Sequence, residues 1–67
     1  MIATYLNKYF DGTYTYYDLV FEENEEQLLR LGGVSFRGDH TIEEMESRVV
    51  EIVGFNLPDY EINQIII

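Results

Sequence analysis

The sequence predicts a single α+β domain, a two-layer sandwich in which one long helix covers one face of an about four-stranded, mostly antiparallel sheet. Three observations lead to this fold class. An Asp-Gly pair lies between two β-rich runs, an amphipathic segment with capping residues follows in the second half, and the chain ends in an apolar strand-like run. Because no linker, internal repeat or low-complexity tract divides the chain, we expect residues 1–67 to form one domain.

Residues 2–21 predict a β-hairpin that folds at Asp11 and Gly12. A type I′ turn needs a positive φ angle at both central residues, and Asp-Gly is one of the pairs that tolerate it best. A two-residue loop then sets the register: Tyr9 lies opposite Tyr14, and the pairing continues residue by residue to Ile2 opposite Phe21. Alternate residues lie on opposite sides of a strand, so the hairpin is predicted to have two different faces.

One predicted face of the hairpin is expected to line the core: Ile2, Leu6, Phe10, Tyr17, Leu19 and Phe21. The other face holds four tyrosines among smaller side chains: Ala3, Tyr5, Asn7, Tyr9, Tyr14, Tyr16, Asp18 and Val20. Tyrosine provides a large contact area with little side-chain entropy to lose, and it is enriched at protein interfaces. The pattern therefore predicts a partner-binding surface: Tyr5, Tyr9, Tyr14, Tyr16 and Asp18. The alternative is that tyrosine, which favours strands, only completes a half-buried surface.

Two interpretations remain open for the segment that follows. In the first, Asn24 caps a short helix over residues 25–31, and Gly32 ends it in a left-handed conformation. In the second, Gly32 and Gly33 form the two-residue loop of another hairpin. We prefer the short helix, and both interpretations place a strand at residues 34–37.

The clearest helix spans residues 42–53, where Thr41 is a suitable N-cap, Glu44 completes a capping box and Gly54 offers a C-terminal stop. Winding at about 100° per residue gathers the apolar side chains into one arc. That arc consists of Ile42, Met45, Val49, Ile52 and Val53. The opposite face is acidic, with Glu43, Glu46 and Glu51 beside Ser47. Glu44 and Arg48 have the spacing of an i,i+4 ion pair.

The last predicted element is a strand over residues 60–67, after Pro58 has disfavoured further helix. Its final residues, Ile65 to Ile67, are apolar on both sides, which is typical of a strand buried on both faces. A single helix covers only one face of the sheet. We therefore expect the tyrosine face of a second copy, or a partner protein, to cover the other.

Charge and size narrow the choice of partners. The formal net charge is −9, from 13 acidic and 4 basic residues, and a surface of this sign repels nucleic acid and anionic membranes. It suits a basic partner instead, unless the charge serves only solubility. A chain of this length buries only about 60% of its unfolded surface. Since it has no Cys for a disulfide, we expect a homodimer or a tight complex with another protein.

The residues offer little for catalysis or cofactor binding. A nucleophilic triad would need a serine or cysteine near a histidine and a carboxylate. The single histidine, His40, lies in a loop beside Asp39, with Ser35 and Ser47 nearby in sequence, and ordinary loop and cap roles explain these residues. The carboxylates at 22–26 lack the spacing of a calcium loop. We therefore predict no enzyme activity, metal or cofactor. Without a signal peptide or an apolar run of about 18 residues, a cytoplasmic location is expected.

In composition the chain is similar to phage-encoded inhibitors of host DNA-handling or defence enzymes, some of which imitate the charge of DNA. We predict a non-enzymatic, acidic protein-binding module of this anti-defence type, which acts by surface occlusion or DNA mimicry in the host cytoplasm. Its acidic surface is expected to comprise Glu22, Glu23, Glu25, Glu26, Glu43, Glu46 and Glu51. The alternatives are a small structural or dimerisation subunit of a larger assembly, and a homo-oligomer that sequesters a small ligand.

Overall fold

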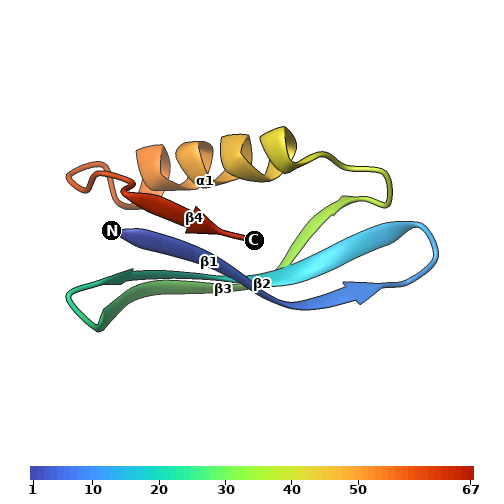
Figure 1. Cartoon of the computed structure of the whole chain (residues 1–67), viewed down its shortest axis with the longest axis horizontal. Helices are drawn as coiled ribbons and strands as arrows, with labels where there is room; N and C mark the ends of the chain where they lie inside the picture. The colour runs from blue at the N-terminus through green and yellow to red at the C-terminus, as the bar shows by residue number, and fades with distance from the viewer.

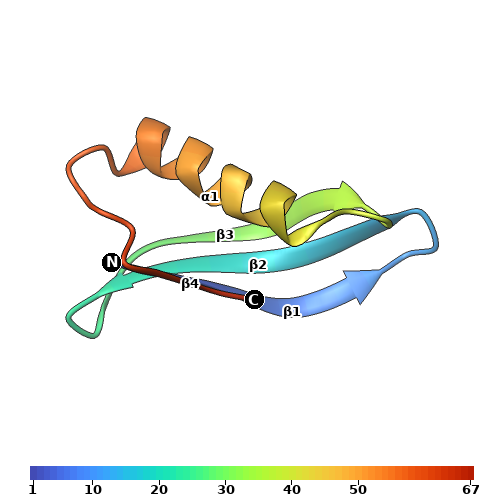
Figure 2. The same cartoon turned by 45° about the horizontal axis from the view of Figure 1, so that its top comes forward.

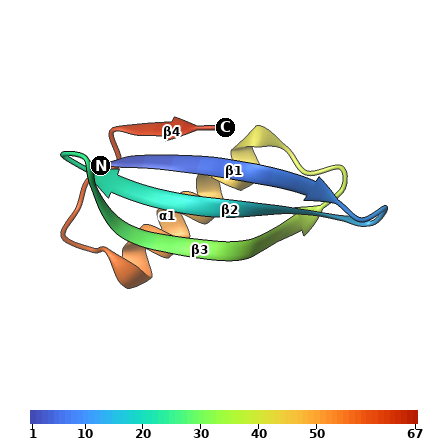
Figure 3. The same cartoon turned by 90° about the horizontal axis from the view of Figure 1, so that it is seen from below.

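The computed structural model describes all 67 residues as one four-stranded sheet with one helix on it (Figure 1). The elements are β1 (Ile2–Phe10), β2 (Tyr14–Glu23), β3 (Glu26–Arg37), α1 (Ile42–Asn56) and β4 (Gln64–Ile66). The strand order is β3-β2-β1-β4, with β4 parallel to β1 and the other pairs antiparallel. The predicted α+β fold class is confirmed, with a mixed sheet. Helix α1 runs across one face only, and the opposite face carries no other element (Figures 2 and 3).

The tip of the β1–β2 hairpin is longer than the predicted two-residue loop. Its first ladder pair joins Phe10 to Thr15. Only Gly12 takes a positive φ angle there, whereas a type I′ turn needs two such residues. The Asp11 carboxylate instead accepts hydrogen bonds from the backbone N–H groups two and three residues on, at 2.9 and 2.8 Å, and so stabilises a wider loop.

A β-bulge in β1 changes which side chains face the helix. Asn7 has a φ angle of 55°, and the register shifts around it. On the N-terminal side of the bulge, Tyr5 pairs with Leu19. The predicted register is therefore wrong by one residue in this half of β1, and such a slip moves every side chain to the other face. Ile2 and Leu6 lie on the face without the helix, not in the core as predicted.

The segment after β2 is a strand, so the predicted short helix over residues 25–31 is wrong. Asn24 and Glu25 have φ angles of 50° and 66° and form a two-residue turn between β2 and β3. The competing hairpin at Gly32 and Gly33 is wrong as well, because both glycines lie inside β3 at a shift in its register. As one long strand, β3 brings all its leucines against the core, which a helix here would not do.

Helix α1 begins as predicted and ends later. Thr41 is its N-cap, and its Oγ1 accepts a hydrogen bond from the Glu44 N–H at 3.2 Å. The predicted stop at Gly54 is wrong, since the helix continues to Asn56 and Leu57 is its C-cap. The helix buries Met45, Val49 and Val53. The other two members of the predicted apolar arc are partly buried (Ile52) or exposed (Ile42).

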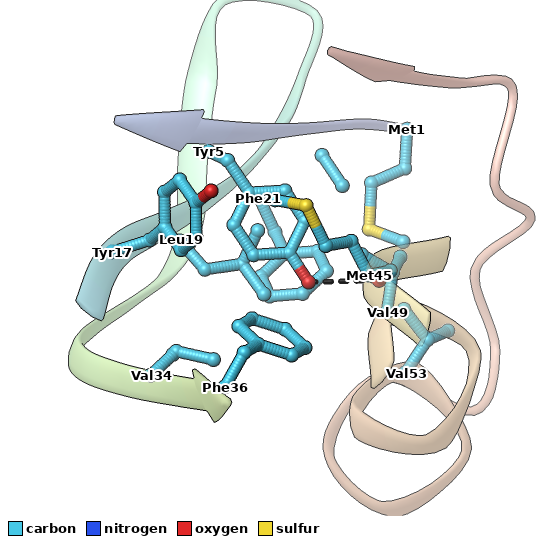
Figure 4. Close-up of a cluster of buried hydrophobic side chains, with 11 residues drawn as sticks. Met1, Tyr5, Tyr17, Leu19, Phe21, Val34, Phe36, Met45, Val49 and Val53 are labelled. Atoms are coloured by element: carbon cyan, nitrogen blue, oxygen red, sulfur yellow. Dashed lines mark hydrogen bonds between the residues drawn. The ribbon is translucent and has the colours of Figure 1, made fainter. Parts of the chain in front are cut away.

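The core lies between α1 and the sheet and is rich in aromatic rings (Figure 4). Tyr5, Tyr17 and Phe36 meet edge to face, with ring centroids 5.2 to 5.9 Å apart. The Arg48 guanidinium lies 4.5 Å from the centroid of the Phe36 ring. It forms no ion pair, so the predicted pair between Glu44 and Arg48 is absent.

Strand β4 lies beside the start of β1. Met1 is buried; its ammonium group contacts Glu23 Oε1 at 3.3 Å and Asn63 Oδ1, and its carbonyl accepts from the Asn63 N–H at 2.8 Å. Ile65 packs against the core. Ile66 and Ile67 remain 42% and 53% exposed, so within one chain the strand is not buried on both faces as predicted.

Candidate protein-binding surfaces

The sheet face opposite α1, here called the open face, has no covering element (Figure 3). Strand register places ten side chains of interest on it: Ile2, Thr4, Leu6, Tyr9, Tyr14, Tyr16, Asp18, Val20, Arg30 and Ile66. Five of these are large apolar side chains with 39% to 64% of their surface exposed: Ile2, Leu6, Tyr9, Tyr14 and Ile66. An isolated exposed apolar residue is ordinary, but a group of this size on one sheet face is typical of an interaction site.

Three of the four predicted tyrosines lie together at the hairpin end of the open face. Tyr9 and Tyr16 are cross-strand neighbours with ring centroids 6.3 Å apart. The Tyr16 hydroxyl donates to Asp11 Oδ2 at 3.1 Å, which raises the pKa of Tyr16. Tyr14 lies beside them with about half of its side chain exposed. The prediction that these tyrosines share a face is confirmed, and their role in binding remains a prediction.

Tyr5 does not belong to this surface, and its predicted role in partner binding is wrong. Only 6% of Tyr5 is exposed, because the bulge at Asn7 turns it beneath the helix. Its hydroxyl donates to the Met45 carbonyl oxygen at 2.8 Å (Figure 4). Burial raises the pKa of Tyr5 to about 12.

A polar strip crosses the middle of the open face. Asp18 accepts hydrogen bonds from Asn7 Nδ2 at 2.7 Å and from Arg30 Nη2 at 3.0 Å. The negative charge of Asp18 is therefore compensated by its ion pair with Arg30. The strip separates the tyrosines from an aliphatic half around Ile2 and Ile66, where a shallow groove of about 250 Å³ runs toward the β2–β3 turn.

We expect substitution of Asp11 to loosen the tyrosine end. The backbone N–H groups of Tyr14 and Thr13 donate to the Asp11 carboxylate and lower its pKa. The contribution of Asp11 to the stability of the tip is therefore present above the pKa of the unfolded chain, and it is lost as pH falls through the pKa of the folded chain. Asp11→Ala should broaden or shift the amide resonances of the tip and lower the pKa of Tyr16. Asp39→Ala, in the neighbouring loop, is the matched control. Unchanged tip resonances in the Asp11 variant would contradict this role.

Most of the acidic side chains lie away from the open face; the exceptions are Asp18 and Glu22, which the β1–β2 ladder places beside Leu6 and Ile2. Glu43, Glu46 and Glu51 are exposed on α1, and the other predicted acidic residues flank the β2–β3 turn: Glu22, Glu23, Glu25 and Glu26. The α1–β4 loop, with Asp59 and Glu61, lies at the same end of the molecule as this turn (Figures 1 and 3). The sequence analysis missed Asp59 and Glu61 because no pattern of neighbouring residues indicates that the α1–β4 loop and the β2–β3 turn lie at the same end of the molecule.

Few of these carboxylates are neutralised. Only two ion pairs form, from the Met1 ammonium to Glu23 and from Arg30 to Asp18. With 13 acidic residues in the chain, 11 have no cation within 4.0 Å. The predicted acidic surface is therefore a region of uncompensated charge, except at Glu23.

His40 has a structural role. Its ring stacks on Phe36 with centroids 5.0 Å apart, Nδ1 donates to the Arg37 carbonyl oxygen at 2.8 Å, and Nε2 accepts from the Tyr17 hydroxyl at 3.1 Å. Both ring nitrogens are thus engaged, and neither bonds to a serine. No group of three or more His, Asp or Glu side chains is placed to hold a metal ion. No helix has both the length and the apolar character needed to span a membrane.

Comparisons with protein families, with curated proteins and with solved structures find no match to this chain. The fold and its surfaces define a small acidic α+β domain with two exposed regions of different chemistry, which meet at the groove beside the β2–β3 turn. One is the apolar and aromatic open face, and the other is the carboxylate-rich outer side of α1 with the β2–β3 turn.

Proposed function

We propose that this chain is a non-enzymatic, acidic protein-binding module that occupies the basic DNA-binding surface of a partner enzyme, as a phage-type inhibitor of a host DNA-handling or defence enzyme in the host cytoplasm. The observation that carries this function is the uncompensated charge, since 11 carboxylates have no ion-pair partner. A surface of this kind attracts a basic groove and accelerates association with it.

The spacing of charge along α1 supports mimicry of DNA. Glu43 and Glu51 are eight residues apart, which is about 12 Å along a helix axis. One strand of B-DNA carries three to four phosphates over that length. Four glutamates fall within this stretch of α1: Glu43, Glu44, Glu46 and Glu51. Arg48 lies in the same stretch, so the net charge there is −3 (four glutamates less one arginine), which is close to the charge of a DNA strand over this length.

Displacement of DNA tests the proposed function. A restriction endonuclease and an ATP-dependent exonuclease, each holding a fluorescein-labelled duplex, are titrated with the chain at 50 mM and 200 mM salt. We expect the chain to release the duplex from at least one of them, with weaker competition at the higher salt because charged contacts are screened. Retention of the duplex on both enzymes at 50 mM salt, where attraction is strongest, would contradict the proposal.

A pair of triple variants distinguishes a specific surface from net charge alone. Glu43→Gln, Glu46→Gln and Glu51→Gln together neutralise the outer side of α1, and we expect them to weaken competition by at least tenfold. The control neutralises three exposed carboxylates elsewhere: Asp39→Asn, Asp59→Asn and Glu61→Gln. Both variants have the same net charge. Equal losses in the two would show that the position of the carboxylates is unimportant and would overturn mimicry by α1.

A further inference from the structure

The open face is the part of the molecule that the proposed function does not use. Its large apolar side chains are 39% to 64% exposed, and only 13 of 67 residues in the chain are buried. A domain of this size usually needs an additional source of burial. We propose that a second copy of the chain covers the open face, so that two sheets pack together with one helix on each outer side.

The size of the open face suits a dimer. The molecule measures about 36 by 19 Å along its two longest axes, so one face offers roughly 700 Å². A standard stable interface buries about 800 Å² per partner. The open face therefore provides nearly the whole area that a specific dimer requires, provided that the two sheets overlap along most of their length.

The distribution of charge favours a second copy on this face. Two chains of net charge −9 repel one another, so they can approach closely only where carboxylates are few or compensated. On the open face, Asp18 is paired with Arg30, and Arg37 lies opposite Tyr14 in the β2–β3 ladder. Glu22 is the carboxylate of this face that has no ion-pair partner, and it lies at the end of the face next to the β2–β3 turn. The exposed glutamates of α1 belong to the helix layer, which lies on the other side of the sheet (Figure 2). Packing through the open face thus keeps the α1 glutamates of the two copies apart.

The apolar side chains that the fold leaves uncovered also fit this arrangement. The terminal strand β4 exposes Ile66 beside the aliphatic half of the face. The tyrosines at the other end combine an apolar ring with a hydroxyl that can remain hydrogen-bonded, as the Tyr16–Asp11 contact does. In the dimer, the α1 glutamates of both copies lie on the outer sides and remain accessible to a basic partner. The dimer itself does not depend on the proposed function.

The solution mass of the full chain tests the dimer. We expect light scattering to give twice the 7.9 kDa chain mass at both 50 mM and 500 mM salt, because an apolar sheet interface responds little to screening. A mass of 7.9 kDa at both salts, at chain concentrations up to 1 mM, would overturn the proposal. Release of DNA is measured separately, so failure of the dimer and failure of the proposed function are distinguishable.

Two variants locate the interface. Leu6→Lys with Tyr14→Lys places charge on the open face at two exposed positions, and we expect at least a tenfold rise in the dissociation constant of the dimer. Phe55→Lys is the control: Phe55 is 82% exposed near the end of α1, outside the open face, and the dimer should persist. A dimer that survives the double substitution, or one that Phe55→Lys abolishes, would place the interface elsewhere.

A measurement on the unmodified chain covers the case in which the double variant fails to fold. Dilution from 1 mM to 10 μM should shift NMR resonances of the open face, including the side chains of Leu6, Tyr9 and Tyr14. Resonances of the outer side of α1, such as those of Val50, should stay constant. Dilution shifts confined to α1 would overturn the proposal, as would spectra that do not change in a chain whose mass is that of a monomer.

Discussion

Phe21→Ala is expected to lower the free energy of unfolding by about 3–5 kcal/mol, which is most of what a domain of this length possesses. Phe21 is the largest completely buried side chain, at 0% exposure in the middle of the core. Truncation to alanine removes the buried ring and leaves a cavity in the core. Thermal unfolding followed by circular dichroism should show a midpoint lowered by about 15 °C or more, or no folded baseline at all.

The matched control for this substitution is Phe55→Ala. Phe55 is 82% exposed, so its truncation removes little buried surface and should change stability by less than about 0.5 kcal/mol. Equal effects of the two substitutions would mean that the core is not organised around Phe21. The dimer adds buried surface outside this core, so both variants are compared at the same chain concentration.

Alkaline pH is expected to destabilise the domain through Tyr5. Burial raises the pKa of Tyr5 from 10.0 to about 12. Below pH 10 the phenol is neutral in both the folded and the unfolded chain, and its full contribution to stability is present. Between pH 10 and 12 the unfolded chain loses this proton first, so stability falls as pH rises. The loss attributable to Tyr5 is about 2–3 kcal/mol by pH 12.

Urea unfolding from pH 8 to pH 12 measures this effect. Tyr5→Phe should be less stable at pH 8 by about 1 kcal/mol, because it loses the hydrogen bond to the Met45 carbonyl, and its stability should fall less steeply above pH 10. Some alkaline loss should remain, since burial also raises the pKa of Tyr17. Tyr60→Phe, in the exposed α1–β4 loop, is the control and should reproduce the unmodified curve. Parallel curves for Tyr5→Phe and the unmodified chain would contradict the role of Tyr5.

The proposed dimer and the acidic surface give this small chain two different contacts, one with a second copy and one with a basic partner. The open face would hold two copies together, and the glutamates of α1 would remain on both outer sides. Each dimer would then present two charged helices to basic partners. This arrangement gives separate uses to the exposed apolar side chains of the sheet and to the glutamates of α1.

Capping residues and apolar periodicity correctly predicted the elements whose structure depends on residues close together in the sequence. Thr41 and the apolar spacing after it predicted α1 because capping and helical periodicity act within a few residues. The inward residues of β2, including Leu19 and Phe21, were also predicted, since simple alternation holds along that side of the strand. Gly54 misled the prediction of the helix end, where packing of Val53 and the capping of Leu57 sustain one further turn.

The candidate site was predicted in part. Tyr9, Tyr14, Tyr16 and Asp18 share the open face as expected, whereas Tyr5 is buried and Ile2, Leu6 and Ile66 were missed. A single residue, Asn7, accounts for the difference between the predicted and the observed faces of β1. The positive φ angle of Asn7 inserts a bulge into β1, and the residues before it change sides. Asparagine tolerates this conformation better than most residues, but that tolerance alone does not indicate a bulge.

A net charge of −9, one capped amphipathic helix, and strands rich in tyrosine and isoleucine can all be read from the sequence. Those properties depend on residue type and on spacing along the chain. Three other features are known only from the folded chain: the face of β1 that meets the helix, the single strand over residues 26–37, and the common end of the two acidic loops. These features depend on pairing between residues far apart in sequence, where a bulge or turn of one residue reverses the face that is buried.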